Sequence, residues 1–220
     1  MIKNVLFDLD GTLLDTRDGI LESIKHAAKE LGYRELSLEE QLSFVGPPIQ
    51  KSFMDHYGCD KEEAQRAADI FRAFYSTQTL LMASPYDGIY ELCEGLKENG
   101  IKMAVATYKR EDYALTLLKH FRFHEYCEVM HGADGENVLK KEDIVRMCIE
   151  ELGARKEECV LIGDTDNDAK GAAAAGIPFI AVTYGFGFKN EKDVSAYPCI
   201  GVAADPMGAL PIILGERAIS

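Results

Sequence analysis

Short apolar runs alternate with stretches of helical periodicity along this chain, and this alternation constrains the fold more than any other feature. The apolar runs lie near residues 3–8, 102–107, 127–130, 159–163 and 179–183. Amphipathic stretches separate them, such as the one that ends at the helix stop signal Asn99-Gly100. Apolar strands that alternate with helices are typical of repeated strand–helix units. We therefore predict an α/β fold with a Rossmann-like parallel sheet.

The alternation stops between residues 15 and 82, where helical signals follow one another without a convincing strand. Two segments have the form of capping boxes, Ser37-x-x-Glu40 and Asp60-x-x-Glu63. We predict an all-helical cap domain at residues 15–82, inserted into a core domain made of residues 1–14 and 83–220. Such an insert either acts as a lid that excludes water from a nearby site or only adds stability.

Two carboxylates straddle one residue in the motif Asp8-Leu9-Asp10-Gly11-Thr12, which directly follows the apolar run Val5-Leu6-Phe7. Open α/β folds bind their ligands where the strands end. Carboxylates this close repel each other unless a cation or a shared proton intervenes, and Mg²⁺ is the cation that the pattern favours. An exposed turn is the alternative interpretation, because Asp and Gly are common turn residues.

A second acidic segment, Gly163-Asp164-Thr165-Asp166-Asn167-Asp168, follows the apolar run Val160-Leu161-Ile162 and precedes a helix of small residues. All strands of a parallel sheet end at one edge, so residues far apart in the sequence can meet there. We therefore expect four acidic residues to converge on one site: Asp8, Asp10, Asp164 and Asp168.

Composition narrows the class of partner. The chain has 220 residues, 47% of them hydrophobic, which is enough for one domain with an insertion. Its net charge of −13 argues against nucleic acid or an anionic membrane as a partner. No apolar stretch is long enough to cross a bilayer, so we expect a soluble protein. The six cysteines form no C-x-x-C pair and no leader segment opens the chain, which favours a cytoplasmic location.

Four motifs occur in a fixed order along the chain: Asp8-Leu9-Asp10-Gly11-Thr12, Ala104-Val105-Ala106-Thr107, Lys140-Lys141, and Gly163-Asp164 with Asp168. With this set the chain resembles the haloacid dehalogenase superfamily of phosphohydrolases, and within it the phosphoglycolate phosphatase-like enzymes that carry a helical cap. The resemblance covers nearly the whole chain. It implies Mg²⁺ as the cofactor and a phosphorylated substrate.

The resemblance also implies roles for the acidic residues. Asp8 is the nucleophile that attacks phosphorus and forms an aspartyl-phosphate. Asp10 is the general acid that protonates the departing alkoxide and then the base that activates water. For Mg²⁺ the implied ligands are Asp8, the backbone carbonyl of Asp10, and Asp164. Asp168 is either a further metal ligand or a residue that braces the site.

Two further residues are implied to contact the phosphoryl group. Thr107, at the end of its strand, donates its hydroxyl to one oxygen, and Lys141 neutralises another. Lys140 is the alternative to Lys141, because a slip of one residue in the preceding loop exchanges them.

Two segments differ from the family pattern or have no role in it. Tyr108-Lys109-Arg110 stands where relatives often have a small residue followed by Lys-Pro, so only Lys109 matches. Tyr108 is then a candidate substrate contact that narrows the phosphate entry, or a residue that packs against the cap. The segment Thr183-Tyr184-Gly185-Phe186-Gly187 also looks like a family feature, and we assign it no chemical role.

A stiff turn, Phe44-Val45-Gly46-Pro47-Pro48, interrupts two helices inside the insert. Its minimal role is a corner between helices. Stiff loops on an insert near a site often contact ligands, so Gly46 and Pro47 are candidate substrate-binding residues.

The function that these features predict is a Mg²⁺-dependent phosphatase acting on a small phosphorylated metabolite, such as phosphoglycolate or a nucleoside monophosphate. One alternative is a phosphomutase of the same superfamily, which would pass the phosphoryl group to a sugar hydroxyl. Another is a noncatalytic regulator that binds Mg²⁺ and phosphate. Monomer and homodimer are both open.

Overall fold

The computed structural model describes residues 1–46, 48–134 and 138–215 of the 220-residue chain. The chain divides into two compact units, one made of Met1–Asp15 and Pro85–Ser220 and the other of Thr16–Ser84. Two short strands, β2 (Leu14–Asp15) and β3 (Ser84–Pro85), pair where the chain leaves the first unit and returns to it. No strand was expected between residues 15 and 82, and Asp15 is the one described residue of that range that lies in a strand, because a two-residue strand carries no periodic signal.

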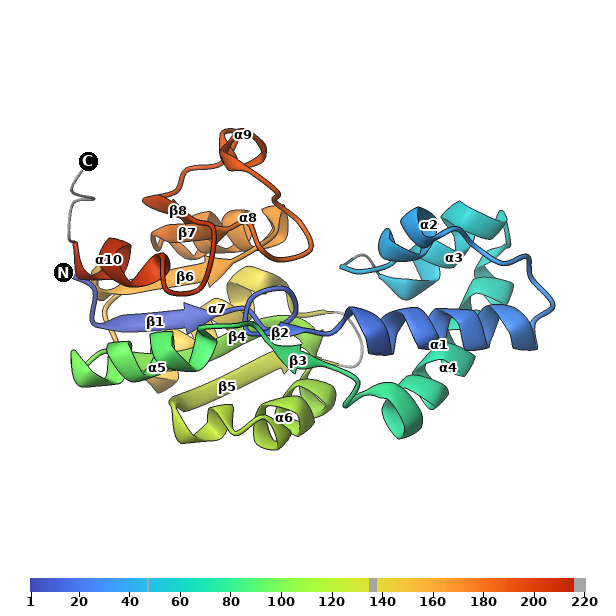
Figure 1. The fold of residues 1–220 in the computed structure, drawn as a ribbon, viewed down its shortest axis with the longest axis horizontal. Coiled ribbons are helices and arrows are strands. Elements are labelled where there is room, and N and C mark those ends of the chain that lie inside the picture. Colours follow the sequence, from blue (N-terminus) through green and yellow to red (C-terminus); the bar gives the residue numbers. More distant parts are fainter. Residues whose placement is uncertain (47, 135–137, 216–220) are drawn as a thin grey trace. The chain divides into compact units, whose positions relative to one another are not determined.

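A six-stranded parallel sheet forms the centre of the first unit (Figure 1). Its strand order is β5-β4-β1-β6-β7-β8. The bounds of these strands are β1 (Asn4–Phe7), β4 (Lys102–Arg110), β5 (Cys127–Ala133), β6 (Cys159–Gly163), β7 (Phe179–Val182) and β8 (Gly201–Ala203). The predicted α/β fold with a Rossmann-like parallel sheet is confirmed. Five of these strands were expected, and the three-residue β8 was missed because it is too short to show alternation.

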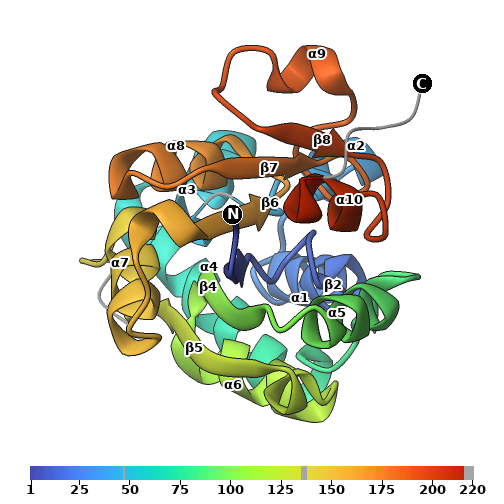
Figure 2. The same ribbon diagram turned by 90° about the vertical axis from the view of Figure 1, so that its left-hand side faces the viewer.

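Helices cover both faces of this sheet (Figure 2). On one face lie α5 (Ile89–Glu98), α6 (Glu111–His120) and α10 (Ala209–Leu214), and on the other α7 (Lys141–Glu151) and α8 (Asp166–Ala175). The described residues of this unit also form shorter helices, namely η2 (Phe123–Glu125), η3 (Lys156–Glu158) and α9 (Glu191–Val194). This three-layer arrangement buries the central strands on both faces, as parallel sheets require.

The register of the sheet positions the site. Phe7 at the end of β1 lies opposite Val105 in β4 and Ile162 in β6. The residues that follow β1 and β6 therefore emerge side by side at one edge. Leu6 and Leu161 are fully buried in a cluster that also holds Ile144 of α7. Burial of side chains of this size stabilises the fold by about 1.5–3 kcal/mol each, so this edge stands on a rigid core.

In the described residues of the second unit before Ser84, every regular element is a helix, and turns and irregular segments connect these helices. Its helices are α1 (Arg17–Glu30), α2 (Leu38–Leu42), α3 (Ile49–Tyr57), α4 (Lys61–Phe74) and the π-helical η1 (Tyr75–Thr79). Both predicted capping boxes are present, at the N-termini of α2 and α4. The helical character predicted for the insert is therefore observed. No helix in the described part of the chain is long and apolar enough to span a membrane.

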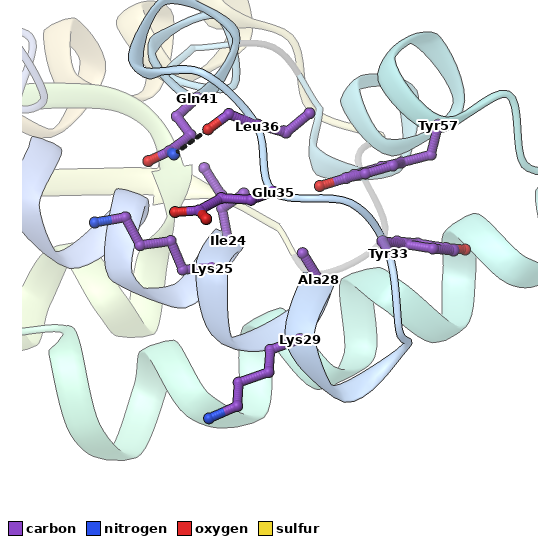
Figure 3. A pocket seen from close by; sticks show the side chains of 9 residues that line it. All are labelled: Ile24, Lys25, Ala28, Lys29, Tyr33, Glu35, Leu36, Gln41 and Tyr57. Atoms are coloured by element: carbon purple, nitrogen blue, oxygen red, sulfur yellow. Dashed lines mark hydrogen bonds between the residues drawn. The ribbon is translucent and has the colours of Figure 1, made fainter.

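A cavity of about 330 Å³ lies within the helical unit, between α1 and the segment that leads into α2 (Figure 3). Its wall includes the stacked rings of Tyr33 and Tyr57, whose centroids are 4.4 Å apart. Gln41 donates its Nε2 to the carbonyl of Leu36 at 2.7 Å. None of its nine lining residues is a predicted site residue.

Candidate active site

The first acidic motif begins at the carboxyl end of β1, in the middle of the sheet. The backbone N–H of Asp8 donates to the carbonyl of Ile162 in β6 at 2.9 Å, which extends the strand pairing by one residue. Asp164 follows the end of β6 and is fully buried, and Asp8 is buried as well. Adjacent parallel strands thus deliver two carboxylates to one edge, as the sequence led us to expect.

Three buried carboxylates form a cluster at this edge. Asp8, Asp164 and Asp168 each offer one oxygen, and these oxygens lie within 4.8 Å of one another. The structure thus brings together three of the four acidic residues that were expected to converge. The side chain of Asp10 does not belong to this cluster.

Lys141 lies at the start of α7 and joins two of these carboxylates. Its Nζ is 2.6 Å from Oδ1 of Asp8 and 2.7 Å from Oδ1 of Asp168. Only 2% of Lys141 is exposed, whereas Lys140 is exposed on the surface as the residue that precedes α7. Of the two lysines that the sequence left open, the structure places Lys141 at the cluster.

Room for Lys141 comes from Gly171 on the neighbouring helix α8. A Cβ atom at Gly171 would lie 2.5 Å from Cγ of Lys141, so a larger residue would displace the lysine stem. Sequence reasoning noted the small residues of this helix without a role for them. The close packing of α7 on α8 is the physical reason for them.

Asp168 is held at both of its carboxylate oxygens. Its Oδ2 accepts the backbone N–H of Thr165 at 3.0 Å and the Thr165 hydroxyl at 2.6 Å, in a capping box at the start of α8. Its Oδ1 pairs with Lys141. These contacts favour bracing over direct metal ligation, the two roles that the sequence left open for Asp168.

Asp10 points to Lys109 instead. The Lys109 Nζ donates to the two carboxylate oxygens of Asp10 at 3.1 and 3.2 Å, and 8% of the lysine side chain is exposed. Lys109 matched the family pattern but received no role from the sequence. Nothing in its local sequence could reveal a partner 99 residues away.

The segment around Thr107 lies at the same edge because β4 extends beyond it. Thr107 is buried, and its Oγ1 accepts the backbone N–H of Lys109 at 3.2 Å. Tyr108 is 37% exposed. The other predicted substrate contacts lie in the helical unit: Gly46 is exposed with φ +107°, and Pro47 lies outside the described residues. The contacts of Gly46 and Pro47 with substrate stay predictions.

Burial and mutual repulsion shift the pKa values of the cluster. Burial raises the pKa of Asp8 to about 6, against the opposing charge of Lys141. Burial, together with the charges of Asp168 and Asp8, raises the pKa of Asp164 to about 7. Burial alone would lower the pKa of Lys141, but Asp168 and Asp8 raise it above its ordinary value. The cluster therefore holds more negative charge than its single lysine compensates.

This donor set fits a magnesium ion. Mg²⁺ takes oxygen ligands at about 2.0–2.1 Å in octahedral geometry, so its ligand oxygens lie roughly 3 to 4 Å from one another. Asp8 and Asp164 each offer an oxygen within 4.8 Å of the other, which is compatible with that geometry. A divalent cation would also stabilise the ionised carboxylates of Asp8 and Asp164, whose pKa values are raised by burial and, to a lesser extent, by the neighbouring carboxylates.

A pH dependence of stability follows for the metal-free protein. Asp8 and Asp164 bind protons more tightly when folded, with pKa values of about 6 and about 7 against 3.8 as the ordinary value. Their contribution to stability is therefore lost as the pH rises through these values and gained as it falls toward 4. We expect urea unfolding in chelator to give a free energy higher by roughly 2 kcal/mol at pH 5.5 than at pH 7.5. The Asp8→Asn/Asp164→Asn double variant is the control, and an equal pH dependence in it would contradict the assignment.

Comparison with known proteins identifies the family. The family model of haloacid dehalogenase-like hydrolases matches residues 5–182. The chain belongs to this hydrolase family. The predicted superfamily is confirmed, and with it the prediction of a phosphoric monoester hydrolase.

Relatives of this hydrolase cover nearly its whole length. A 5'-nucleotidase of Pseudomonas aeruginosa is 36% identical over 189 residues, which are 86% of this chain and 86% of that protein. The tyrosine-protein kinase PtkA of Mycobacterium tuberculosis is 37% identical over 201 residues, which are 91% of this chain and 68% of the kinase. The crystal structure of a predicted phosphatase from Clostridium acetobutylicum superposes with a TM-score of 0.87 at 32% identity, covering 98% of this chain and 99% of the other.

Proposed function

We propose that this hydrolase is a Mg²⁺-dependent phosphatase of small phosphomonoesters that works through an aspartyl-phosphate on Asp8. One observation carries the proposal: the buried cluster of Asp8, Asp164 and Asp168 around Lys141. A purely structural turn has no need for three buried carboxylates so close together that burial and neighbouring charge raise the pKa values of Asp8 and Asp164. In this proposal Asp8, the backbone carbonyl of Asp10 and Asp164 hold the metal, which supplies positive charge to the phosphoryl oxygens.

Asp8 performs the chemical step in two halves. A carboxylate oxygen of Asp8 attacks phosphorus, the bond from phosphorus to the alkoxide oxygen breaks, and Asp10 gives its proton to the alkoxide. Water then attacks the aspartyl-phosphate, Asp10 takes a proton from it, and the bond from phosphorus to Asp8 breaks. Lys109 holds the Asp10 carboxyl in place between the halves.

The remaining residues position the reactants. Lys141 holds the Asp8 carboxylate in one orientation through its contact with Oδ1, and its positive charge also favours the anionic phosphoryl group. Thr107 offers its hydroxyl to a phosphoryl oxygen, and Tyr108 lies beside it as a substrate contact. Asp168 braces Lys141. We propose that the helical unit serves as the cap, with Gly46 and Pro47 facing the substrate.

A nucleoside monophosphate is the substrate that we propose first. The support is the 36% identity to the Pseudomonas aeruginosa protein named 5'-nucleotidase. Phosphoglycolate is the other small phosphomonoester that the sequence motifs favour. A cytoplasmic location fits the six cysteines, all of which are free thiols.

The test is phosphate release from a panel of phosphomonoesters. The panel comprises nucleoside 5'-monophosphates, phosphoglycolate, a hexose 1-phosphate and p-nitrophenyl phosphate, each measured with Mg²⁺ and with EDTA. We expect turnover with Mg²⁺, a loss of at least about 100-fold in EDTA, and recovery when Mg²⁺ is restored. Activity that persists in chelator would remove the metal from the mechanism.

Other products would indicate a different activity. Isomerisation of the hexose 1-phosphate without phosphate release would indicate the phosphomutase. Transfer from ATP to a tyrosine peptide would indicate the activity for which the mycobacterial relative is named. Mg²⁺ binding with no turnover on any substrate would indicate the noncatalytic regulator.

A further inference from the structure

The segment from Tyr184 to Lys189, here called the 184–189 loop, lies against Asp164. Oδ2 of Asp164 accepts the backbone N–H of Phe186 at 2.6 Å and that of Gly187 at 3.0 Å. The backbone carbonyl of Asp164 accepts the N–H of Phe188 at 2.7 Å. Three consecutive backbone amides of one loop therefore donate to Asp164, two of them to its buried carboxylate and one to its backbone carbonyl.

This contact depends on two glycines because the loop passes so close to Asp164. A Cβ atom at Gly185 would lie 2.2 Å from the carbonyl oxygen of Gly11, and one at Gly187 would lie 2.4 Å from the carbonyl oxygen of Asp164. These obstacles are backbone atoms, which cannot turn aside as a flexible side chain can. Any side chain at either position would push the loop away from the carboxylate.

Two side chains anchor the ends of the loop. The hydroxyl of Tyr184 donates to the carbonyl of Thr12 at 3.0 Å, which ties the loop to the first acidic motif. Nζ of Lys189 donates to the carbonyl of Gly185 at 2.5 Å, which closes the loop on itself. Phe188 is buried. The two amides that bind the Asp164 carboxylate are therefore held in place by the protein itself.

We propose that the 184–189 loop is a positioning element that dictates how Asp164 binds the metal. Its two N–H donors bind Oδ2 at 2.6 and 3.0 Å, whereas Oδ1 accepts the longer hydrogen bond of the Thr12 hydroxyl at 3.5 Å. Oδ1 is therefore the oxygen more available to Mg²⁺, and the carboxylate presents a single ligating oxygen. The hydrogen bonds also replace the water that this carboxylate loses on burial. The inference rests on the proposed Mg²⁺ site and gives a role to a segment that the family resemblance left without one.

Direct Mg²⁺ binding tests the proposal without relying on turnover. Lys189→Met removes the side-chain anchor, and Lys192→Met is its matched control, because Lys192 is exposed on α9. Gly187→Ala displaces the amides themselves, and Gly208→Ala is its control, because a Cβ there finds its nearest neighbour at 3.4 Å. Isothermal titration with Mg²⁺ alone gives the affinity, and thermal unfolding in chelator reports folding.

We expect Gly187→Ala to weaken Mg²⁺ binding by about 10- to 100-fold, which is the range for partners that orient a metal ligand. Lys189→Met should weaken it less, with unchanged metal-free unfolding, and both controls should bind like the wild type. With saturating Mg²⁺ the rate of phosphate release should return toward the wild-type value. A loop that merely stabilises the fold would lower the unfolding temperature without changing the affinity.

The outcomes separate the two proposals. Wild-type affinity in folded Gly187→Ala and in Lys189→Met would overturn the role of the loop and leave the proposed phosphatase standing. If Gly187→Ala fails to fold, Lys189→Met alone decides. Weakened Mg²⁺ binding in the variants of a protein that releases no phosphate would support the loop and overturn the phosphatase. A wild type that binds no Mg²⁺ would overturn both.

Discussion

Asp8→Asn is expected to abolish phosphate release while the fold is retained. The amide cannot form the aspartyl-phosphate, so turnover of p-nitrophenyl phosphate should fall by about four to six orders of magnitude, the scale on which a lost nucleophile acts. The carbonyl oxygen of the new side chain can still accept the hydrogen bond from Lys141 that Asp8 now accepts at 2.6 Å.

Stability distinguishes lost chemistry from lost structure in this variant. Burial raises the pKa of Asp8 to about 6, so its negative charge at pH 7.5 is unfavourable in the metal-free fold. A neutral amide removes that charge, and the free energy of unfolding in chelator should stay the same or rise. Turnover like that of the wild type would refute Asp8 as the nucleophile.

Asp166→Asn is the matched control for this change. Asp166 belongs to the second acidic segment, is exposed, and pairs with Lys170 on the surface of α8. Its substitution also removes one carboxylate from an acidic motif. We expect its turnover and its unfolding free energy to stay close to the wild-type values, because exposed ion pairs contribute about 0–1 kcal/mol.

The fold could be predicted because its signals are local. The strands β1, β4, β6 and β7 each contain a continuous apolar run, and the long helices carry an apolar face. The capping boxes at Ser37 and Asp60 are equally local, since they need only residues three apart. The strands β2, β3 and β8 escaped prediction because two or three residues cannot establish a period.

Only the part of the site that follows from the topology of the sheet could be predicted. Parallel strands end at one edge, so the meeting of Asp8 with Asp164 follows from the strand assignment alone. The choice between Lys140 and Lys141 does not, because adjacent helix positions differ in burial only after α7 is packed on α8.

The backbone hydrogen-bond donors of the site cannot be predicted from the identity of the residues. The amides that hold Asp164 come from Phe186 and Gly187, which lie 22 and 23 residues further along the chain. Every residue except proline carries such an N–H, so the sequence gives no sign of which ones face a carboxylate. The two glycines were the available signal, since glycine in a loop permits close approach of the backbone.

Lys141→Met should damage both stability and activity, because this lysine is the positive charge that pairs with two buried carboxylates. Its loss leaves Asp8 and Asp168 without the ion pairs now seen at 2.6 and 2.7 Å. Removing one partner from a buried ion pair costs about 3–5 kcal/mol, and we expect a loss of that size in chelator at pH 7.5. Turnover should fall by at least about 100-fold, since a charge aimed at the phosphoryl oxygens is removed as well.

A change of pH and a second substitution show whether unpaired charge causes the stability loss in Lys141→Met. The stability loss should shrink at pH 5.5, where Asp8, whose pKa is already about 6, binds a proton. The double variant Lys141→Met/Asp168→Asn should recover part of the stability and none of the activity, because it removes one unpaired charge without restoring the lysine.

Lys140→Met supplies the control from the neighbouring position. Its side chain is exposed, so the free energy of unfolding should change by less than about 0.5 kcal/mol and turnover should persist. The reverse result, an inactive Lys140→Met beside an active Lys141→Met, would mean that the phosphoryl group meets the surface lysine. The buried ion pairs of Lys141 would then be structural, and the cluster would bind a metal without being the site of phosphoryl transfer.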